Sequence, residues 1–444
     1  MRKMEQIVQI NAPKASFSDP NFAKNKKTPI HRWVPWIAGY SNEFVESAID
    51  KYLDEPGKTV LDPFCGVGTT LLSAIYRGHN AIGFEINPYA ALASKTKVIA
   101  NQLDTNAFDS EIKKLKKYYA RKLAGDDFVG SAPSGFKTKG EFYSPLVLRK
   151  VLIAKKFIDE ITDEKIREFF RLAFGATMVQ YSNYSYEPSL GQRKSAGKAD
   201  IEDYDVAGAI IDKLEVMLED VVYAKKLAET VSIGKAKVIC DSFFNYEKYL
   251  KKGSVDLLLT SPPYLNNYHY IRNTRPQLYW LNYAENPEDL KPLETGSFGK
   301  YWQTVRQGPL LELTFSTDDG RIEACIEEIR ATNNVNKSYG GPGWANYVVA
   351  YLNDCYRFAE GMNYCLKKGG TANIVIGNNI IQGIPVPTDV FFGQIAELAG
   401  LTLVEIHVPR SKRAGDSIIH SSIRIGEAKK DANLYEAVVE LRAD

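Results

Sequence analysis

Two short apolar runs, each followed by a helix-like segment, constrain the fold of this 444-residue chain more than any other feature. Residues 58–64 (KTVLDPF) have the pattern of a buried strand, which the glycine turn Gly66–Gly68 joins to a helix over 69–77. A second strand is expected over 81–86 (AIGFEI), and another helix begins near Pro88. This order of elements predicts the first part of a doubly wound α/β sheet. Such sheets bind ligands at the carboxyl ends of their strands.

The sheet-forming pattern is interrupted and then resumes. The further strands and helices that we expect from apolar spacing are a helix over 42–53, strands over 236–240 and 254–260, a helix over 344–366, a strand over 372–376, a helix over 388–399 and a strand over 401–408. We therefore predict an α/β fold with one Rossmann-like, doubly wound sheet that carries helical and irregular insertions.

This organisation divides the chain into five stretches. Residues 1–103 hold an N-terminal arm and the first part of the sheet domain, and residues 104–230 form a mostly helical insertion. The sheet continues in 231–282, after which a second, irregular insertion rich in Asn, Gly and Pro occupies 283–342. Residues 343–444 complete the sheet domain.

Composition limits the class of protein. Hydrophobic residues make up 44% and charged residues 25% of the chain, the balance of a soluble globular protein. A net charge of +2 excludes a polybasic, histone-like protein, and no apolar run approaches the roughly 18 residues of a membrane span. The 5 cysteines form no CxxC pair, so we expect reduced thiols in a cytoplasmic protein and no metal site.

The first group of candidate site residues surrounds the glycine turn. Asp62 ends the first expected strand, and Gly66 and Gly68 let the chain turn tightly against a ligand. Glu85 ends the second strand, where an acid accepts hydrogen bonds from ribose hydroxyls in other nucleoside-binding sheets. Many strand-to-helix turns contain a bare GxG for steric reasons, but the glycines combined with Asp62 and Glu85 favour a nucleoside site.

The second group follows the apolar strand VDLLL. Thr260 and the sequence Ser261-Pro262-Pro263-Tyr264 stand at the ligand-binding edge of the expected sheet. Two prolines stiffen this loop, and the Pro262 carbonyl stays free to accept a hydrogen bond. Ser261 can exchange a hydrogen bond with an exocyclic amine, and Tyr264 offers a flat face for stacking a planar base. For this loop taken by itself, an ordinary Pro-rich turn is the alternative.

Together, the segments LDPFCGVGTT (61–70), GFEINPYA (83–90) and TSPPY (260–264) resemble the S-adenosylmethionine-dependent amino-methyltransferases of DNA, which modify cytosine N4 or adenine N6. The resemblance implies the methyltransferase form of the sheet, S-adenosyl-L-methionine as the cofactor and double-stranded DNA as the partner. It also implies a prokaryotic, nucleoid-associated protein of the cytoplasm, with no membrane contact and with a cognate restriction endonuclease that acts on the same site.

The resemblance assigns roles to individual residues. Asp62, Cys65 and Gly66 are expected to line the methionine side of the cofactor, and Glu85 to hold its ribose. Asp241, directly after the strand AKVIC, matches the residue that bonds the adenine amine. The full set of expected cofactor-binding residues is Trp33, Asp62, Pro63, Phe64, Cys65, Gly66, Gly68, Thr69, Glu85, Ile86, Asp241, Ser242 and Thr260.

Two of these assignments have structural alternatives. Trp33 belongs to the segment HRWVPW (31–36), which is similar to the element that the family places beside the methionine end of the cofactor. A plain core position is the alternative for this tryptophan. Asp241 precedes the sequence SFF, so capping of a helix is the alternative for its carboxylate.

Serine before the two prolines, in place of Asp or Asn, favours cytosine N4 over adenine N6 within this family. A base inside a duplex is out of reach, so it must be flipped into the pocket. We expect Ser261 and the Pro262 carbonyl to orient its amine and Tyr264 to stack on its ring, and these three with Pro263 are the expected catalytic residues. Methyl transfer to an amine needs positioning, so no cysteine is expected to act as a nucleophile.

Target recognition is expected in the insertions, because only 35 residues follow Pro409. Residues 111–150 contain 10 Lys/Arg against 4 Asp/Glu, a net charge of +6, whereas residues 151–230 contain 11 against 15, a net charge of −4. Within the helical insertion Arg193 and Lys194 suit phosphate contacts, although their loop is equally well explained as a solvated one. The expected DNA-binding residues are Arg193, Lys194, Asn267, Tyr268 and Arg272.

Two rival classes of function remain at this stage. An RNA or protein methyltransferase would use the same sheet and a related Pro-Pro-Tyr loop, but the sequence contains no recognisable RNA-binding module. A non-catalytic DNA-binding module would retain the fold, and the intact motif residues argue against it. An adenine-N6 methyltransferase is the alternative within the favoured family.

Overall fold

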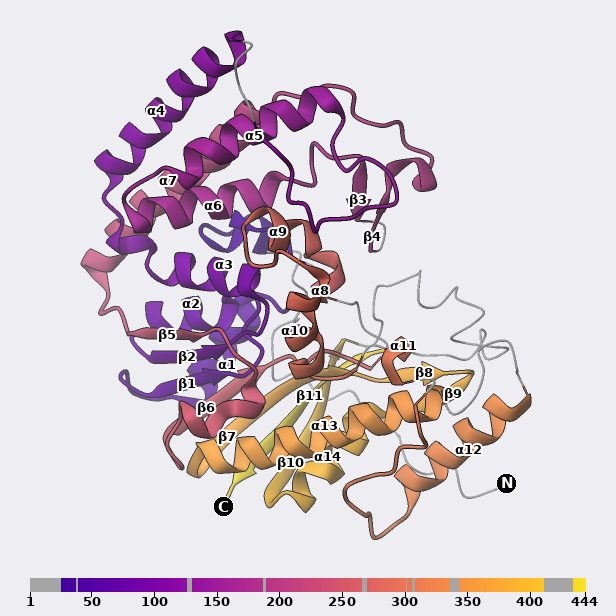
Figure 1. Ribbon diagram of the computed structural model, residues 1–444. Coiled ribbons are helices and arrows are strands. Elements are labelled where there is room, and N and C mark those ends of the chain that lie inside the picture. Colours follow the sequence, from indigo (N-terminus) through magenta and orange to yellow (C-terminus); the bar gives the residue numbers. More distant parts are fainter. Residues whose placement is uncertain are drawn as a thin grey trace.

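A seven-stranded sheet forms the centre of the computed structural model (Figure 1). The model describes residues 25–36, 39–125, 130–186, 189–265, 270–300, 302–305, 308–335, 343–410 and 434–444. The strands of the sheet are β1 (Thr59–Asp62), β2 (Asn80–Phe84), β5 (Ala236–Ile239), β6 (Val255–Thr260), β7 (Leu366–Gly377), β10 (Leu401–Arg410) and β11 (Glu436–Ala443).

The order of the strands creates a point where the winding of the chain reverses. The strands lie in the order β10-β11-β7-β6-β1-β2-β5. β1 pairs in parallel with β2 on one side and with β6 on the other, so the chain winds in opposite directions from this point. β11 runs antiparallel to both of its neighbours, β7 and β10. Ligands of doubly wound sheets bind at the carboxyl ends next to such a reversal, which here are Asp62 and Thr260.

Helices cover both faces of the sheet and give each face its own hydrophobic core. α1 (Asn42–Tyr52), α2 (Thr69–Tyr76) and α3 (Pro88–Val98) lie on one face, and α13 (Gly343–Cys365) and α14 (Thr388–Leu398) on the other. Side chains of a strand alternate between faces, so Val60 of β1 joins the first core and Leu61 joins the second. The prediction of a doubly wound α/β sheet is confirmed.

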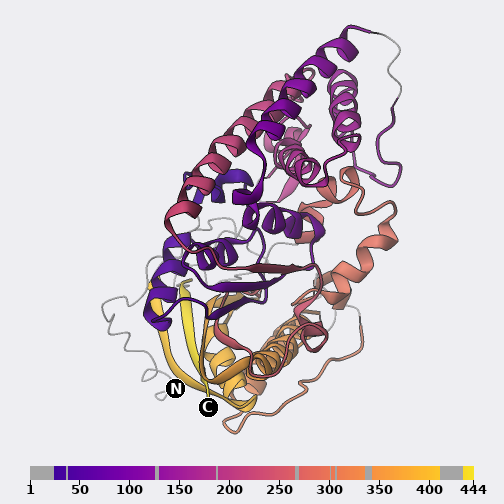
Figure 2. The ribbon, with the colours of Figure 1, turned by 90° about the vertical axis from the view of Figure 1, so that its left-hand side faces the viewer.

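The helical insertion stands beside the sheet as a tower that rises from α3 (Figures 1 and 2). It consists of α4 (Thr105–Ala124), α5 (Pro145–Asp159), α6 (Glu164–Thr177) and α7 (Val206–Thr230), with a hairpin of β3 (Tyr184–Tyr186) and β4 (Leu190–Gln192). α8 (Tyr270–Asn273) and α9 (Arg275–Trp280) connect the sheet to this tower. Among the described helices, none is both long and apolar enough to span a membrane.

The stretch 283–342 is more regular than its composition suggests. It holds α10 (Lys291–Gly296), α11 (Trp302–Val305) and α12 (Arg321–Val335), so the expectation of an irregular insertion is wrong for these residues. Ile322, Ile326 and Ile329 of α12 are at most 3% exposed and follow helical spacing. The surrounding Asn, Gly and Pro residues obscured this short periodic run.

Two further differences lie at the end of the chain. The sequence analysis did not predict β11, or the hairpin of β8 (Asn379–Ile381) and β9 (Ile384–Val386). β11 buries Val438, Val439 and Leu441 because it lies between two other strands and both of its faces are covered. A strand covered on both faces lacks the alternation that marks a surface strand.

The N-terminal arm falls largely outside the described residues, which begin at Asn25. The described part is packed against the domain: Asn25 is 1% exposed and Ile30 is 2% exposed. Asn25 Nδ2 donates a hydrogen bond of 3.1 Å to the Tyr40 carbonyl. The expectation of an arm therefore does not hold from Asn25 onward, because the amide side chain ties the segment to the start of α1.

Candidate active site

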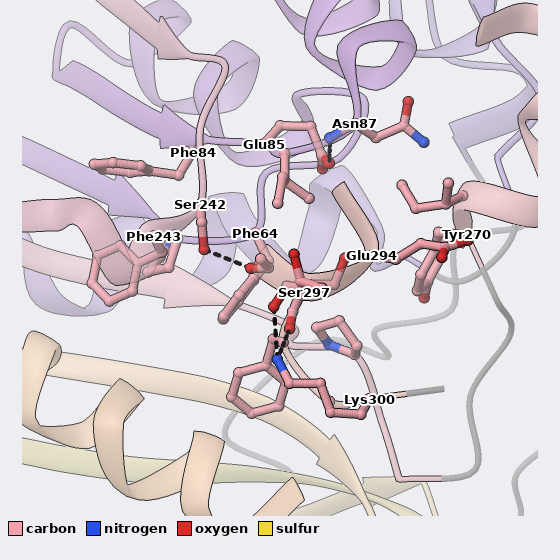
Figure 3. A pocket seen from close by; sticks show the side chains of 18 of the residues that line it. Phe64, Phe84, Glu85, Asn87, Ser242, Phe243, Tyr270, Glu294, Ser297 and Lys300 are labelled. Atoms are coloured by element: carbon pink, nitrogen blue, oxygen red, sulfur yellow. Dashed lines mark hydrogen bonds between the residues drawn. The ribbon is translucent and has the colours of Figure 1, made fainter. Parts of the chain in front are cut away.

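A cavity of about 520 Å³ opens at the carboxyl ends of β1, β2, β5 and β6 (Figure 3). This volume lies within the roughly 300–1,000 Å³ typical of small-molecule sites. Residues from both predicted groups line it, namely Pro63, Phe64, Gly66, Glu85, Ile86, Asp241, Ser242, Ser261, Pro263 and Tyr264. The structure therefore brings the glycine turn, the acid after β2 and the Ser-Pro-Pro-Tyr loop to a single cavity.

Glu85 presents a carboxylate to the cavity at the end of β2. Its Oε1 accepts a hydrogen bond of 2.7 Å from the Asn87 backbone N–H, which fixes the side chain beside the start of α3. Loss of solvent around the group raises the pKa of Glu85 to about 7, and hydrogen bonds from backbone N–H groups oppose this rise. A poorly solvated carboxylate of this kind gains from hydroxyl donors on a ligand.

The glycine turn leaves room for a ligand next to an aromatic wall. Gly66 has a φ of 50°, and a Cβ at this position would lie 3.3 Å from Trp36 Nε1. Trp36 and Tyr270 both line the cavity, and their rings stack with centroids 6.2 Å apart and an interplanar angle of 12°. Because Gly66 has no side chain, a ligand that packs against these two rings can approach the backbone closely.

Asp241 borders the cavity at the end of β5. Its Oδ1 accepts hydrogen bonds from the Ser242 N–H (2.7 Å) and Asn245 Nδ2 (2.9 Å), and its Oδ2 accepts one of 2.7 Å from the Tyr249 hydroxyl. Partial burial raises the pKa of Asp241, but these hydrogen bonds outweigh it and lower the pKa below its ordinary value. Ser242 provides the N-cap of the following 3₁₀ helix by accepting from the Phe244 N–H, so the capping alternative for Asp241 is not needed.

The Ser-Pro-Pro-Tyr loop forms another wall of the cavity. Ser261 Oγ lies 3.4 Å from the Tyr264 hydroxyl, which in turn lies 3.5 Å from Glu436 Oε1 at the start of β11. The Tyr264 ring packs against the second hydrophobic core. Pro262 is buried, whereas Ser261, Pro263 and Tyr264 line the cavity.

Asp62 lies behind the cavity wall, which corrects the expectation that it lines the methionine side. It is 2% exposed, and its Oδ1 accepts from Thr260 Oγ1 (2.6 Å) and the Phe64 N–H (3.1 Å). Its Oδ2 accepts from the Tyr40 hydroxyl (2.8 Å) and Thr70 Oγ1 (2.5 Å). With both of its oxygens engaged by the protein, Asp62 links the ends of β1 and β6 through Thr260, and neither residue lines the cavity.

Trp33 is also displaced from its expected role. Its indole is fully buried, and the centroid of this ring lies 5.5 Å from that of Phe169. The indole Nε1 donates a hydrogen bond of 2.8 Å to Asp220 Oδ2. This confirms the core alternative, and Trp36 borders the cavity in its place. Three other expected cofactor residues, Cys65, Gly68 and Thr69, lie behind the lining; Cys65 Sγ instead lies 3.8 Å from Ser94 Oγ.

The structure describes three of the expected DNA-binding residues, Arg193, Lys194 and Arg272. Asn267 and Tyr268 lie outside the described residues, and Arg272 is exposed on α8. Arg193 Nε donates to the Ala199 carbonyl at 2.8 Å, and Lys194 pairs with Asp200 at 2.5 Å, so both side chains also bond within their own turn.

The positive charge of 111–150 is partly neutralised. Lys113 pairs with Asp109 on α4, and Lys116 pairs with Glu215 of α7. α4 rises away from the sheet in both views (Figures 1 and 2). The ion pairs and the position of α4 both weaken the argument that this charge faces DNA bound at the cavity.

Several lining residues were missed by the sequence analysis. The missed residues include Asn87 and Phe243, together with Lys291 and residues 294–300 of the second insertion. Asn87 carried a signal, since an Asn-Pro pair after a strand is a typical helix start. It caps α3 and donates from Nδ2 to Thr274 Oγ1 at 2.7 Å, which ties α3 to the segment after the Ser-Pro-Pro-Tyr loop.

The sheet with its reversal next to β1, the glycine turn and the acid after β2 are typical of α/β proteins that bind a nucleoside-containing ligand. Comparison with known proteins narrows this class. The family described as DNA methylase, with adenine N6 and cytosine N4 members, matches residues 8–96.

Curated relatives match along most of the chain. The type II methyltransferase M.BsoBI of Geobacillus stearothermophilus is 23% identical over 436 residues, which cover 89% of this chain and 83% of the relative. The type II methyltransferase M.AvaI of Nostoc sp. is 24% identical over 420 residues, which cover 87% and 82%. These matches support an S-adenosylmethionine-dependent DNA methyltransferase of the kind that acts on adenine N6 or cytosine N4.

Proposed function

We propose that the protein transfers a methyl group from S-adenosylmethionine to the N4 amine of a cytosine. This cytosine lies within a specific sequence of duplex DNA and is flipped out of the helix. One observation carries the proposal: Ser261 and Tyr264 border the same cavity as Glu85 and the Gly66 turn. Groups suited to a nucleoside cofactor and groups suited to an exocyclic amine therefore face a shared space.

The lining residues fit the cofactor from end to end. Gly66 with Trp36 and Tyr270 would receive the methionine end, where aromatic faces favour a sulfonium cation. Glu85 would accept from the ribose hydroxyls, and Asp241 from the adenine amine. When bound, the cofactor supplies an electrophilic methyl group on sulfur.

The chain's own residues would prepare the target amine. The lone pair of an exocyclic amine is delocalised into the ring, so the nitrogen is a poor nucleophile. Ser261 Oγ and the Pro262 carbonyl would accept hydrogen bonds from the N–H groups of the amine. These bonds would turn the nitrogen lone pair toward the methyl group. Stacking on Tyr264 would offset part of the cost of flipping, by about 1–3 kcal/mol.

The assignment of cytosine rests on Ser261. The alternative is adenine N6, where the family has Asp or Asn before the two prolines. The physical difference between the two is that a hydroxyl is a less anionic acceptor than a carboxylate. An RNA substrate is the more distant alternative.

We propose that the helical insertion, residues 104–230, contributes to target recognition through its hairpin. The Tyr186 hydroxyl of β3 donates to the Asn273 carbonyl at 3.1 Å, and the Leu190 N–H of β4 donates to Asn273 Oδ1 at 3.1 Å. Asn273 ends α8, whose Tyr270 and Ile271 line the cavity. These bonds support a recognition hairpin, followed by Arg193 and Lys194, next to the flipped base.

The biological context follows from the relatives. Those with matches over most of the chain are type II methyltransferases by name. We therefore propose a modification enzyme of the prokaryotic cytoplasm, associated with the nucleoid, that protects sites cut by a cognate restriction endonuclease.

The decisive experiment is methylation of DNA followed by mass spectrometry of its nucleosides. Purified protein is incubated with labelled S-adenosylmethionine and either plasmid DNA or RNA. N4-methylcytosine in DNA supports the proposal, and N6-methyladenine alone would correct the base but keep the enzyme class. Label in RNA and none in DNA would overturn the substrate.

A further inference from the structure

A short part of the second insertion covers the cavity. Residues 291–300, here named the strap, comprise α10 and the turn that follows it, and all but Pro292 and Leu293 line the cavity. In Figure 3, Glu294, Ser297 and Lys300 of the strap lie below Glu85 and Asn87, and Ser242 is hydrogen-bonded to the strap. The stretch 283–342 was a candidate for DNA contact, but this part of it faces the cofactor site.

The strap touches the strand ends that would hold the nucleoside part of the cofactor. Ser242 Oγ, just after β5, donates a hydrogen bond of 2.7 Å to the Gly296 carbonyl. A Cβ on Gly296 would lie 2.8 Å from Ile86 Cδ1, just after β2, so the strap backbone approaches this side chain closely. The strap thus crosses the cavity on the side of Glu85 and Asp241.

Phe298 anchors the middle of the turn. Its ring is 5% exposed and lies 5.2 Å from the Phe64 ring and 5.9 Å from the Phe358 ring, measured between centroids. Phe64 belongs to the segment after β1 and Phe358 to α13. The Phe64 and Phe358 rings themselves lie 5.1 Å apart between centroids, so the strap packs through one aromatic side chain onto a cluster that joins the segment after β1 to α13.

Asp354 of α13 fastens the end of the strap. It is 4% exposed, and its Oδ2 accepts a hydrogen bond of 3.0 Å from the Gly299 N–H and lies 3.5 Å from Lys300 Nζ. Lys300 Nζ also donates to the carbonyls of Thr295 (2.9 Å) and Ser297 (3.1 Å). The lysine thus links the carbonyl end of α10 to a buried acid on a neighbouring helix.

We propose that the strap closes over bound S-adenosylmethionine, that Asp354 is the positioning residue that holds it closed, and that cofactor exchange requires it to open. The inference rests on the proposed placement of the cofactor in this cavity. The strap is a short segment tied at its two ends to Ser242 and Asp354, and local units of this kind can open without global unfolding. Asp354 does not line the cavity, so it acts through the strap.

The test measures exchange of the cofactor separately from methyl transfer. Asp354→Asn keeps the size of the side chain but removes the charge that faces Lys300, and Lys300→Gln removes the lysine while Arg357 stays 3.6 Å from Asp354. In stopped-flow displacement of S-adenosylmethionine, followed by tryptophan fluorescence, we expect both variants to release the cofactor at least 10-fold faster. KM for the cofactor should rise by a similar factor while the rate of a single turnover at saturating cofactor stays within 2-fold.

A matched control is Asp109→Asn, which removes an ion-paired and exposed aspartate from α4. It should exchange cofactor at the wild-type rate. Faster exchange of the Gly299 amide hydrogen in Lys300→Gln would show directly that the strap opens more often, and this measurement serves if Asp354→Asn fails to fold.

The outcomes separate the two proposals. Wild-type protein that binds no S-adenosylmethionine in calorimetry would overturn the proposed cofactor site. Wild-type protein that binds it, with unchanged release in folded Lys300→Gln and Asp354→Asn, would overturn the strap and leave the proposed function intact. A slower single turnover with unchanged release would also contradict the strap, since it would place these residues in the transfer step.

Discussion

Thr260 Oγ1 donates a 2.6 Å hydrogen bond to Asp62 Oδ1, and both residues are buried where the sheet reverses its winding. The bond joins the last residue of β6 to the last residue of β1. The first strand end leads into the Ser-Pro-Pro-Tyr loop and the second into the glycine turn. The relative position of these two segments is therefore held by a pair of side chains that do not line the cavity.

Replacing Thr260 by Val keeps the shape of the side chain but leaves the buried Asp62 carboxylate without one donor. We expect a loss of about 1–3 kcal/mol in the free energy of unfolding, measured by urea denaturation. Displacement of the loop should also slow single-turnover methylation by roughly 10-fold to 100-fold. Thr332→Val, which removes a hydroxyl bonded within α12, is the matched control. Normal turnover in Thr260→Val would show that the bond has no positioning role.

Glu85 makes cofactor affinity depend on pH. Its pKa of about 7 means that the carboxylate, which is the better acceptor for ribose hydroxyls, forms as the pH rises through 7. We expect the affinity for S-adenosylmethionine to increase between pH 6 and about pH 8 in calorimetric titrations. Glu85→Gln should flatten this dependence and weaken binding at the upper pH by about 1.5–3 kcal/mol. A steep pH dependence that survives in Glu85→Gln would assign it to another group.

The same group affects stability with the opposite sign. The folded protein holds the Glu85 proton between its ordinary pKa of 4.5 and about 7, whereas the unfolded chain has released it. The contribution to the free energy of unfolding is therefore full below pH 4.5 and is lost as the pH rises through 7. In the absence of cofactor, Glu85→Gln should remove this part of the pH dependence in urea titrations, and an unchanged profile would contradict the raised pKa.

The two tryptophans of the segment 31–36 should behave differently. Trp33→Phe loses the hydrogen bond to the buried Asp220, so we expect it to cost about 1.5–3 kcal/mol of stability and leave cofactor affinity unchanged. Trp36→Ala removes one face of the aromatic wall and should weaken cofactor binding by about 1–2 kcal/mol with a smaller effect on stability. Thermal unfolding and calorimetry of both variants check the pair. Weaker cofactor binding in Trp33→Phe, with unchanged binding in Trp36→Ala, would show that Trp33 contacts the cofactor.

Variants of the Ser-Pro-Pro-Tyr loop separate chemistry from cofactor binding. Ser261→Ala should lower the rate of methyl transfer and leave the affinity for S-adenosylmethionine near that of wild type. Tyr264→Ala should impair turnover more than Tyr264→Phe, because stacking uses the face of the ring and not the hydroxyl. Wild-type turnover in Tyr264→Ala would exclude stacking as part of the mechanism.

The turn after the recognition hairpin offers a test of DNA binding. Replacing both Arg193 and Lys194 by Ala should weaken DNA binding and reduce its salt dependence, since phosphate contacts release counterions. Cofactor affinity should not change. Fluorescence anisotropy with labelled duplex DNA at several salt concentrations measures both effects. Equal DNA binding by the double variant and the wild type would show that Arg193 and Lys194 bond only within their turn. DNA recognition would then belong to other parts of the insertions.

The fold class and most of the site could be predicted from the sequence because both depend on short, local patterns of residues. Each strand that leads to the cavity is an apolar run that ends in a motif, and the alternation of strands and helices predicts the doubly wound order. The Gly66 turn, Glu85, Asp241 and Ser261 could be located because carboxyl ends of parallel strands meet at one edge of a sheet.

Tertiary structure decided what depends on contacts between distant segments. Trp33 and Trp36 are three residues apart, and the buried Asp220 of α7 selects which of them leaves the cavity. Asp62 has the sequence position of a ligand-binding acid, but Tyr40, Thr70 and Thr260 occupy both of its oxygens.

The strap shows the same limit of local signals. It consists of short elements with no apolar period of its own, and its place over the cavity depends on Ser242 and Asp354, which lie on either side of it in the sequence. A motif determines which chemical groups stand at the end of a strand. Whether such a group faces a ligand or the protein interior depends on which donors the rest of the chain brings within hydrogen-bond distance, and that is a property of the folded chain.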